Sequence, residues 1–179
     1  NIKHHKNNKN FLFKNIDIRS IKRKSAIFSN LNYVFHFAGL GDIVPSILNP
    51  KEYFEVNSQG TLNLLDNIKD LKLKKFLYAA SSSCYGLAKT PTKENEPIDT
   101  KYPYALSKYL GEQVCLNYAN SYKMPVNSIR IFNAYGTRSK TSGAYGAVFG
   151  VFLKQILSDA PLTIVGDGKQ SRDFVYVTD

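Results

Sequence analysis

Short apolar runs alternate along this chain with longer segments in which apolar residues recur at helical spacing. The apolar runs predict strands near residues 11–16, 32–38, 74–80 and 126–132, with a further short strand at 162–165. The helical spacing predicts helices near residues 46–70, 102–122 and 143–158. Apolar strands that lack in–out alternation and are separated by helices are typical of a parallel sheet buried on both faces. The pattern therefore predicts an α/β protein with a doubly wound parallel sheet.

The helix predicted at 102–122 carries a tyrosine and a lysine four residues apart, in the segment Tyr104-Ala-Leu-Ser-Lys108. Residues at this spacing share one face of a helix, so an ammonium group lies close to a phenol. A nearby cation favours the phenolate, and a phenolate can act as a base closer to neutral pH. The pair alone is weak evidence, because Tyr-x-x-x-Lys often arises by chance on a solvated helix face.

A cluster of small polar residues, Ser81, Ser82 and Ser83, follows the strand predicted at 74–80 and ends at Tyr85-Gly86. Ligands of parallel sheets bind beyond the carboxyl ends of the strands. By themselves these serines indicate a turn with a helix cap. Together with the tyrosine–lysine pair downstream, they favour a Ser/Tyr/Lys catalytic group.

The chain has 179 residues and a formal net charge of +10. Such a charge suits a nucleic-acid or anionic-membrane partner, but the lysines are spread along the chain, with clusters only at 3–14 and 22–24. We therefore expect a solvated basic surface and no nucleic-acid partner. Because no apolar run approaches the ~20 residues that span a bilayer, we also expect no membrane partner. The two cysteines, which lack a disulfide or metal spacing, favour a cytoplasmic location.

The cysteines and histidines show no spacing typical of metal ligands. Cys84 and Cys115 lack a C-x-x-C arrangement and are interpreted as reduced structural thiols. Among His4, His5 and His36, only His36 lies in a predicted strand, where a satisfied core histidine is the expected role. The sequence therefore predicts no metal site.

Six segments, in order along about residues 11 to 179, resemble the extended short-chain dehydrogenase/reductases. Within that group the similarity is to the NAD-dependent epimerase/dehydratase family, of the UDP-glucose 4-epimerase type. The segments are Asp17-Ile18-Arg19, Val34 to Leu40, Asn57 to Thr61, the serine loop with the Tyr/Lys pair, Arg130 to Gly136, and Val165 to Val177. The resemblance implies a Rossmann-like sheet, NAD as cofactor and a nucleotide-diphosphate sugar as substrate.

The resemblance also implies which residues bind NAD. The Asp17 carboxylate would accept from the adenine amino group, although a turn aspartate at the end of a strand is the alternative. Asn57 lies in mid-helix, where asparagine is unfavourable, so we expect a specific hydrogen bond to cofactor-side backbone or between the central strands. The other expected cofactor-binding residues are Ile18, Phe37, Ala38, Gly39, Leu40, Lys108 and Phe132.

On the substrate side, the resemblance assigns Asn133 and Arg172 to the nucleotide diphosphate, with a structural pair between Arg172 and Asp173 as the alternative. A guanidinium donates two parallel hydrogen bonds to phosphate oxygens. The sugar would contact Ser81, Ser82 and Tyr104. The catalytic residues implied are Ser81, Tyr104 and Lys108, with Tyr104 taking the proton of the C4 hydroxyl while hydride passes to NAD.

The serine loop bears on the reaction that follows this first oxidation. Related 4,6-dehydratases place an Asp-Glu pair where this chain has Ser82 and Ser83, and a serine cannot act as a carboxylate acid or base. The resemblance therefore favours C4 epimerisation of a UDP-hexose, UDP-N-acetylhexosamine or UDP-hexuronate through a 4-keto intermediate. A 4,6-dehydratase, a reductase or a non-catalytic nucleotide-binding protein on the same fold are the alternatives.

The resemblance divides the chain into a partial NAD-binding Rossmann domain, residues 1–136, and the start of a nucleotide-sugar-binding portion, residues 137–179. No Gly-x-Gly-x-x-Gly loop follows an early strand, although such a loop normally cradles the pyrophosphate. We expect a piece of a longer protein that lacks the first βαβ unit and the C-terminal part. A protein built without that loop is the alternative. We expect this piece to bind NAD poorly or not at all, and the full-length protein to form a homodimer.

Overall fold

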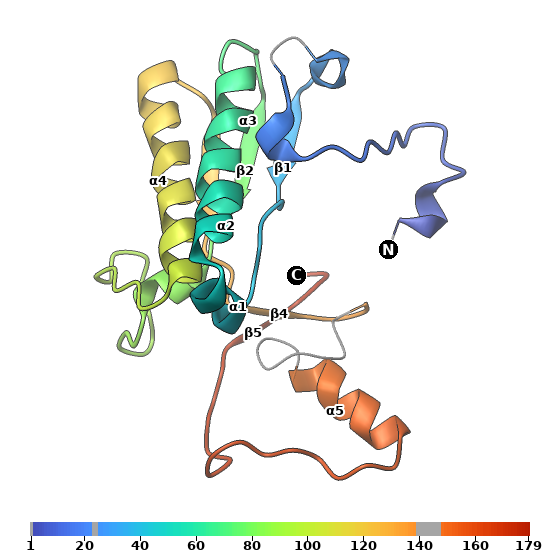
Figure 1. Ribbon diagram of the computed structural model, residues 1–179, viewed down its shortest axis with the longest axis vertical. Helices are drawn as coiled ribbons and strands as arrows, with labels where there is room; N and C mark the ends of the chain where they lie inside the picture. Colours follow the sequence, from blue (N-terminus) through green and yellow to red (C-terminus); the bar gives the residue numbers. More distant parts are fainter. Residues whose placement is uncertain (1, 23–24, 139–147) are drawn as a thin grey trace. The chain divides into compact units, whose positions relative to one another are not determined.

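A computed structural model describes residues 2–22, 25–138 and 148–179 of the chain. They form two compact units, and Figure 1 shows their helices and strands. The larger unit is Ile16–Ile131, and the smaller comprises Asn1–Asn15 with Phe132–Asp179.

A three-stranded parallel sheet forms the centre of the larger unit. It contains β1 (Tyr33–His36), β2 (Lys75–Ala79) and β3 (Val126–Ile129), with β2 in the middle. In the register, Phe35 pairs with Leu77 and Leu77 with Asn127. The strands predicted near 32–38, 74–80 and 126–132 are confirmed, and each is shorter than its apolar run.

The helices of the larger unit are α1 (Ile43–Leu48), α2 (Pro50–Phe54), α3 (Gly60–Ile68) and α4 (Pro103–Tyr122). One turn of π-helix, η4 (Glu55–Gln59), joins α2 to α3, so the helix predicted at 46–70 contains a local change of pitch. Proline stands in the first turn of both α2 and α4, where its fixed φ favours helix initiation. The chain leaves α4 through Lys123, which adopts a left-handed conformation with φ of 56°.

The core lies between the sheet and helices α3 and α4, which run side by side in Figure 1. Leu65 and Ile68 of α3, Phe76 and Tyr78 of β2 and Cys115 of α4 are all fully buried. The opposite face of the sheet carries Tyr33 and Phe35, which are 54% and 68% exposed. In the described part of the chain, helices therefore cover one face of the sheet.

Short 3-10 helices complete this unit: η2 (Ile18–Ser20), η3 (Ala26–Phe28) and η5 (Ser82–Tyr85). The smaller unit contains η1 (Lys3–His5), α5 (Val148–Leu157) and a parallel pair of strands, β4 (Asn133–Tyr135) and β5 (Phe174–Tyr176). Aromatic rings join α5 to the two strands, since Phe149 lies 4.8 Å from the rings of both Tyr135 and Phe174.

Two predicted strands are absent from the structure, and β4 and β5 were not predicted. Residues 11–16 and 162–165 form no strand, because neither segment pairs with another strand among the described residues. Strand β5 was not predicted, since its apolar run is only Phe174 to Val177 and follows a polar turn. Of the helix predicted at 143–158, residues 143–147 lie outside the described residues.

Candidate active site

Ser81 and Tyr104 meet at the carboxyl end of β2. Ser81 follows the strand and caps η5, because its hydroxyl accepts a hydrogen bond of 3.2 Å from the Ser83 N–H. Tyr104 lies in the first turn of α4, and its hydroxyl donates to Ser81 Oγ at 3.3 Å. The cap interpretation and the catalytic interpretation of this serine are therefore compatible, since one hydroxyl makes both contacts.

Lys108 lies one helical turn after Tyr104 and is 7% exposed. Its ammonium lies 4.6 Å from the centre of the Tyr78 ring, a favourable cation–π contact. Within the described residues, no hydrogen-bond acceptor contacts this ammonium. Burial lowers the pKa of Lys108 to about 8, because desolvation disfavours the charged form.

Asn57 is 1% exposed and lies in the π-helical turn η4. Its side-chain oxygen accepts from the Leu40 N–H at 2.7 Å, and its amide nitrogen donates to the Leu40 carbonyl and to Ser107 Oγ, both at 3.0 Å. Asn57 thus ties the loop after β1 to helix α4. The specific hydrogen bond expected of a mid-helix asparagine is present, and it goes to the loop backbone. Single π-helical turns occur frequently at functional sites.

The loop after β1 contains Phe37 to Leu40 and approaches Asn57 and Lys108 closely. A Cβ added to Gly39 would lie 2.9 Å from Asn57 Oδ1 and 3.6 Å from Lys108 Nζ. Only glycine fits here without displacing the amide. Phe37 is 58% exposed, so the loop presents backbone and an aromatic side chain to its surroundings.

Tyr53 of α2 contacts both this loop and the candidate base. Its hydroxyl donates to the Gly41 carbonyl, and its ring lies edge-on to the Tyr104 ring at 6.3 Å. Desolvation raises the pKa of Tyr53, which keeps this hydroxyl a donor. The sequence analysis did not single out Tyr53, although a tyrosine four residues before Asn57 shares its helix face.

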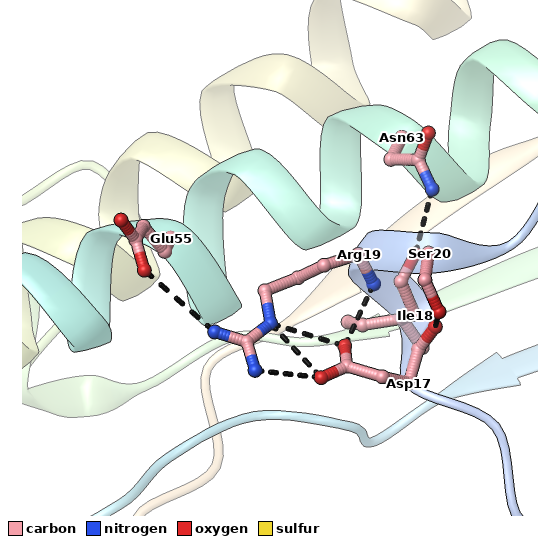
Figure 2. A network of polar contacts seen from close by, with 6 residues as sticks. All are labelled: Asp17, Ile18, Arg19, Ser20, Glu55 and Asn63. Carbon is pink, nitrogen blue, oxygen red and sulfur yellow. Dashed lines mark hydrogen bonds and ion pairs between the residues drawn. The ribbon is translucent and has the colours of Figure 1, made fainter.

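The Asp17 segment folds against α3 (Figure 2). Asp17 caps η2 by accepting from the Arg19 N–H at 2.8 Å, and its Oδ2 lies 2.6 Å from Arg19 Nη2. Arg19 Nη1 also lies 3.7 Å from Glu55 Oε2. Hydrogen bonding to Arg19 holds the pKa of the Asp17 carboxyl below its usual range. The expectation that Asp17 ends a strand is wrong, because a capped 3-10 turn begins there.

Backbone and packing contacts fix Ile18 beside this carboxylate. The Asn63 amide donates to the Ile18 carbonyl at 2.7 Å (Figure 2). A Cβ on Gly60 would lie 2.7 Å from Ile18 Cδ1, so the isoleucine packs directly on the start of α3. The segment is therefore held against α3 by side-chain hydrogen bonds from Asn63 and Asn67 and by a close apolar contact.

The remaining expected site residues lie near the end of β3 or in the smaller unit. The Ser82 N–H donates to the Ile131 carbonyl at 3.3 Å. In the smaller unit, the Asn133 amide donates to the Asp173 carbonyl at 2.8 Å, and Phe132 is 39% exposed. Arg172 is exposed and donates from Nη1 to the Ser171 carbonyl at 2.7 Å.

The structure thus brings together a serine, a tyrosine, a lysine and an asparagine-held loop within the larger unit. A hydroxyl in contact with a phenol can relay or orient a proton, and a buried ammonium can stabilise a negative oxygen. Across the described residues, no cluster of three His, Cys, Asp or Glu side chains could hold a metal ion. None of the described helices has the length and apolar character needed to cross a membrane.

Comparison with known proteins agrees with this arrangement. The family model "NAD dependent epimerase/dehydratase family" matches residues 1–179. A UDP-glucuronate 4-epimerase of Thermodesulfobacterium geofontis is 34% identical over 177 residues, covering 97% of this chain and 54% of that protein. A putative UDP-glucose 4-epimerase of Methanocaldococcus jannaschii is 36% identical over 170 residues, covering 93% of this chain and 55% of that protein. The chain spans about half the length of the curated relatives it matches.

A solved structure shows the same fold. The crystal structure of UDP-glucuronic acid 4-epimerase from Bacillus cereus, in complex with UDP-glucuronic acid and NAD, superimposes with a TM-score of 0.89 at 31% identity. The match covers 99% of this chain and 55% of that one. The parallel sheet with its helices is therefore an incomplete Rossmann-like fold, as the sequence predicted. The chain belongs to the NAD-dependent epimerase/dehydratase family.

Proposed function

We propose that the complete protein catalyses the NAD-dependent epimerisation of a nucleotide sugar at C4, through a 4-keto intermediate. The observation that carries this proposal is the 3.3 Å contact between the Tyr104 hydroxyl and Ser81 Oγ, with the Lys108 ammonium buried one turn along the same helix. A protein that only binds nucleotides has no need of all three groups together.

Each residue has a distinct role in the proposed reaction. Tyr104, as phenolate, accepts the proton of the C4 hydroxyl and later returns it to the same oxygen. Ser81 hydrogen-bonds the sugar oxygen and orients it toward the phenol. Lys108 contributes a positive charge that stabilises the phenolate while the proton is held.

The residues around Lys108 fit an NAD molecule. The ammonium lies beside Gly39, in a loop where a side chain would not fit, and it has donors left for ribose hydroxyls. We assign NAD binding to Asp17, Ile18, Phe37, Ala38, Gly39, Leu40, Asn57, Lys108 and Phe132. A bound NAD would supply reversible hydride transfer at C4 of the sugar.

We assign the substrate to the UDP-sugars, because the similar proteins above are a UDP-glucuronate 4-epimerase and a putative UDP-glucose 4-epimerase. Ser81, Ser82 and Tyr104 would contact the sugar. Asn133 and Arg172 would hold the diphosphate, and the exposed Arg172 guanidinium has donors beyond the one that contacts Ser171. The candidate sugars are a hexose, an N-acetylhexosamine and a hexuronate, and the assay below tests one UDP-sugar of each kind.

We further propose that the complete protein is a homodimer that pairs through α3 and α4. An open groove of about 620 Å³ runs along these helices, lined by Leu62, Leu110, Val114 and Leu116 together with polar serine, glutamine and asparagine side chains. Leu110 and Leu116 are 39% and 38% exposed. Light scattering should show a dimer for the wild type and a monomer for Leu110→Lys.

A cytoplasmic location is also proposed, since both cysteines are free thiols, as in reducing compartments.

The test of the reaction uses the complete protein with UDP-glucose, UDP-N-acetylglucosamine and UDP-glucuronate in separate incubations. NMR of each mixture should show the 4-epimer of at least one sugar. A 4-keto-6-deoxy sugar would instead establish the dehydratase alternative. Binding without any change in the sugar would establish the non-catalytic alternative.

A further inference from the structure

A buried ion pair joins helix α4 to the residue that follows β3. Arg130 Nη2 lies 2.7 Å from Glu112 Oε1, and Arg130 Nε lies 3.0 Å from Oε2. Both side chains are largely buried, with 18% and 4% of their surface exposed. These hydrogen bonds raise the pKa of Arg130, so the guanidinium stays charged. Two parallel hydrogen bonds fix its direction as well as its distance from the carboxylate.

Glu112 shares a helix face with the candidate base. It lies four residues after Lys108 and eight after Tyr104, and side chains at this spacing form one column. Any rotation of α4 that moves the Glu112 carboxylate therefore also moves the Tyr104 hydroxyl.

Arg130 adjoins the segment that carries Ser81. The Ala80 N–H donates to the Ile129 carbonyl at 2.9 Å, and the Ser82 N–H donates to the Ile131 carbonyl at 3.3 Å. These two bonds continue the β2–β3 pairing past the strand ends and place Arg130 opposite Ala80, the residue before Ser81. The ion pair thus connects the Ser81 side of the site to the Tyr104 side.

A third contact reaches the end of the serine loop. Arg130 Nη1 donates to the Tyr85 hydroxyl at 2.7 Å and to the Glu94 carbonyl at 3.2 Å. The Arg130 guanidinium also lies 4.8 Å from the centre of the Tyr85 ring. Tyr85 closes η5, the turn that Ser81 caps. The guanidinium therefore holds the Tyr85 end of the loop in relation to α4, while the Ile129 and Ile131 carbonyls hold the Ser81 end.

We propose that Glu112, Arg130 and Tyr85 are positioning residues that hold Ser81 within reach of Tyr104. This proposal rests on the proposed epimerase function. None of the three touches the reacting atoms; they act through the placement of Ser81 and Tyr104. A buried ion pair adds little stability compared with apolar residues of the same volume, so its contribution lies in fixing orientation.

The test compares variants of the complete protein. Glu112→Gln removes a charge at nearly constant volume. Arg130→Lys keeps the charge but loses the two parallel hydrogen bonds of the guanidinium. Tyr85→Phe removes the hydroxyl that accepts a hydrogen bond from Arg130. Asp66→Asn is the matched control, because it breaks the Asp66–Lys69 ion pair of 2.5 Å on α3, away from the serine loop. For each protein, kcat and KM for the UDP-sugar are measured, together with amide hydrogen exchange of residues 82–86.

In Glu112→Gln we expect kcat to fall by about 10- to 100-fold while KM changes less than about twofold, because displacements near 1 Å cost rates of this order. Arg130→Lys should retain more activity than Glu112→Gln, and exchange at 82–86 should rise in both. A kcat within twofold of wild type in Glu112→Gln and Tyr85→Phe, or exchange equal to that of the control, overturns the proposal. If Glu112→Gln does not fold, Tyr85→Phe decides.

If the wild-type protein turns over no UDP-sugar, the proposed function is wrong. The positioning role is then tested by the amide hydrogen exchange of the variants alone. Faster exchange confined to residues 82–86 and the start of α4 would then support it. Unchanged exchange, or a uniform increase over the whole chain, would overturn it.

Discussion

The Asn57 side chain bonds both backbone groups of Leu40, accepting from its N–H at 2.7 Å and donating to its carbonyl at 3.0 Å. The two residues are 17 positions apart and belong to different elements. A side-chain amide is the only common group that supplies one acceptor and two donors in this geometry, and the second donor bond reaches Ser107. The loop after β1 and the start of α4 are therefore held by a single residue.

Replacing Asn57 with Asp should destabilise the protein. Aspartate keeps the acceptor but loses both donor bonds, and it places a carboxylate beside the Leu40 carbonyl. Two lost buried hydrogen bonds correspond to about 2–5 kcal/mol of unfolding free energy. Urea unfolding of the complete protein measures this value. Asn120→Asp, at an exposed position of α4, is the control and should change stability by less than about 0.5 kcal/mol.

Tyr104→Phe should abolish turnover while leaving UDP-sugar binding largely intact. The substitution removes the acid–base oxygen that contacts Ser81 and keeps the ring that packs edge-on to Tyr53. We expect kcat to fall by about 10²–10⁴-fold, the usual contribution of general acid–base catalysis. Calorimetric titration with the UDP-sugar checks binding. Tyr109→Phe, on the same helix, should retain activity; undiminished turnover in Tyr104→Phe would refute the assigned base.

The sequence predicted the parts of the fold that depend on strong local periodicity. Helix α4 begins one residue after its predicted start and ends at the predicted residue, because Pro103 marks the first turn and a 20-residue helix gives a clear signal. The contact between Ser81 and Tyr104 could also be anticipated, since parallel strands end at one edge of a sheet. Both inferences needed only spacing along the chain and the rule for parallel sheets.

The contacts that depend on distant partners could not be predicted. Glu112 lies on helix α4, and Arg130 follows strand β3, 18 residues later in the chain. No helical or strand periodicity of the sequence therefore links them. The pairing of Asp17 with Arg19 was missed because the motif was interpreted as a strand end, whereas a capped turn forms there. The one signal in the sequence was that Glu112 places a carboxylate on the buried face of α4.

Lys108 should give the protein a distinct dependence of stability on pH. Burial lowers its pKa from 10.5 to about 8, so between these values the unfolded chain binds more protons than the folded one. Stability therefore rises with pH through this window, by up to about 3 kcal/mol for this residue. Urea unfolding at pH 7.5 and pH 10.5 should show the gain in the wild type relative to Lys108→Met. If the free energy of unfolding changed with pH in the same way in both proteins, the lowered pKa of Lys108 would be contradicted.

The same titration should limit activity on the alkaline side. Because the Lys108 ammonium loses its charge near pH 8, its stabilisation of the Tyr104 phenolate is lost as the pH rises above that value. We expect kcat of the wild type to decline above about pH 8. Lys108→Arg, which stays charged, should lose this decline even if its overall rate is lower. A profile that keeps rising to pH 10 in the wild type would exclude a required ammonium.

Gly39 and Gly41 form a matched pair within one loop. A Cβ at Gly39 would lie 2.9 Å from Asn57 Oδ1, whereas a Cβ at Gly41 would meet no atom within 4 Å. Gly39→Ala must therefore push the Asn57 amide away from Leu40, and overpacking of this kind costs about 1–3 kcal/mol. Gly41→Ala should change stability by less than about 0.5 kcal/mol. Thermal unfolding of the complete protein checks both values, and NAD titration should show weaker binding for Gly39→Ala alone. Equal effects of the two substitutions would mean that loop flexibility, and not the contact with Asn57, sets the response.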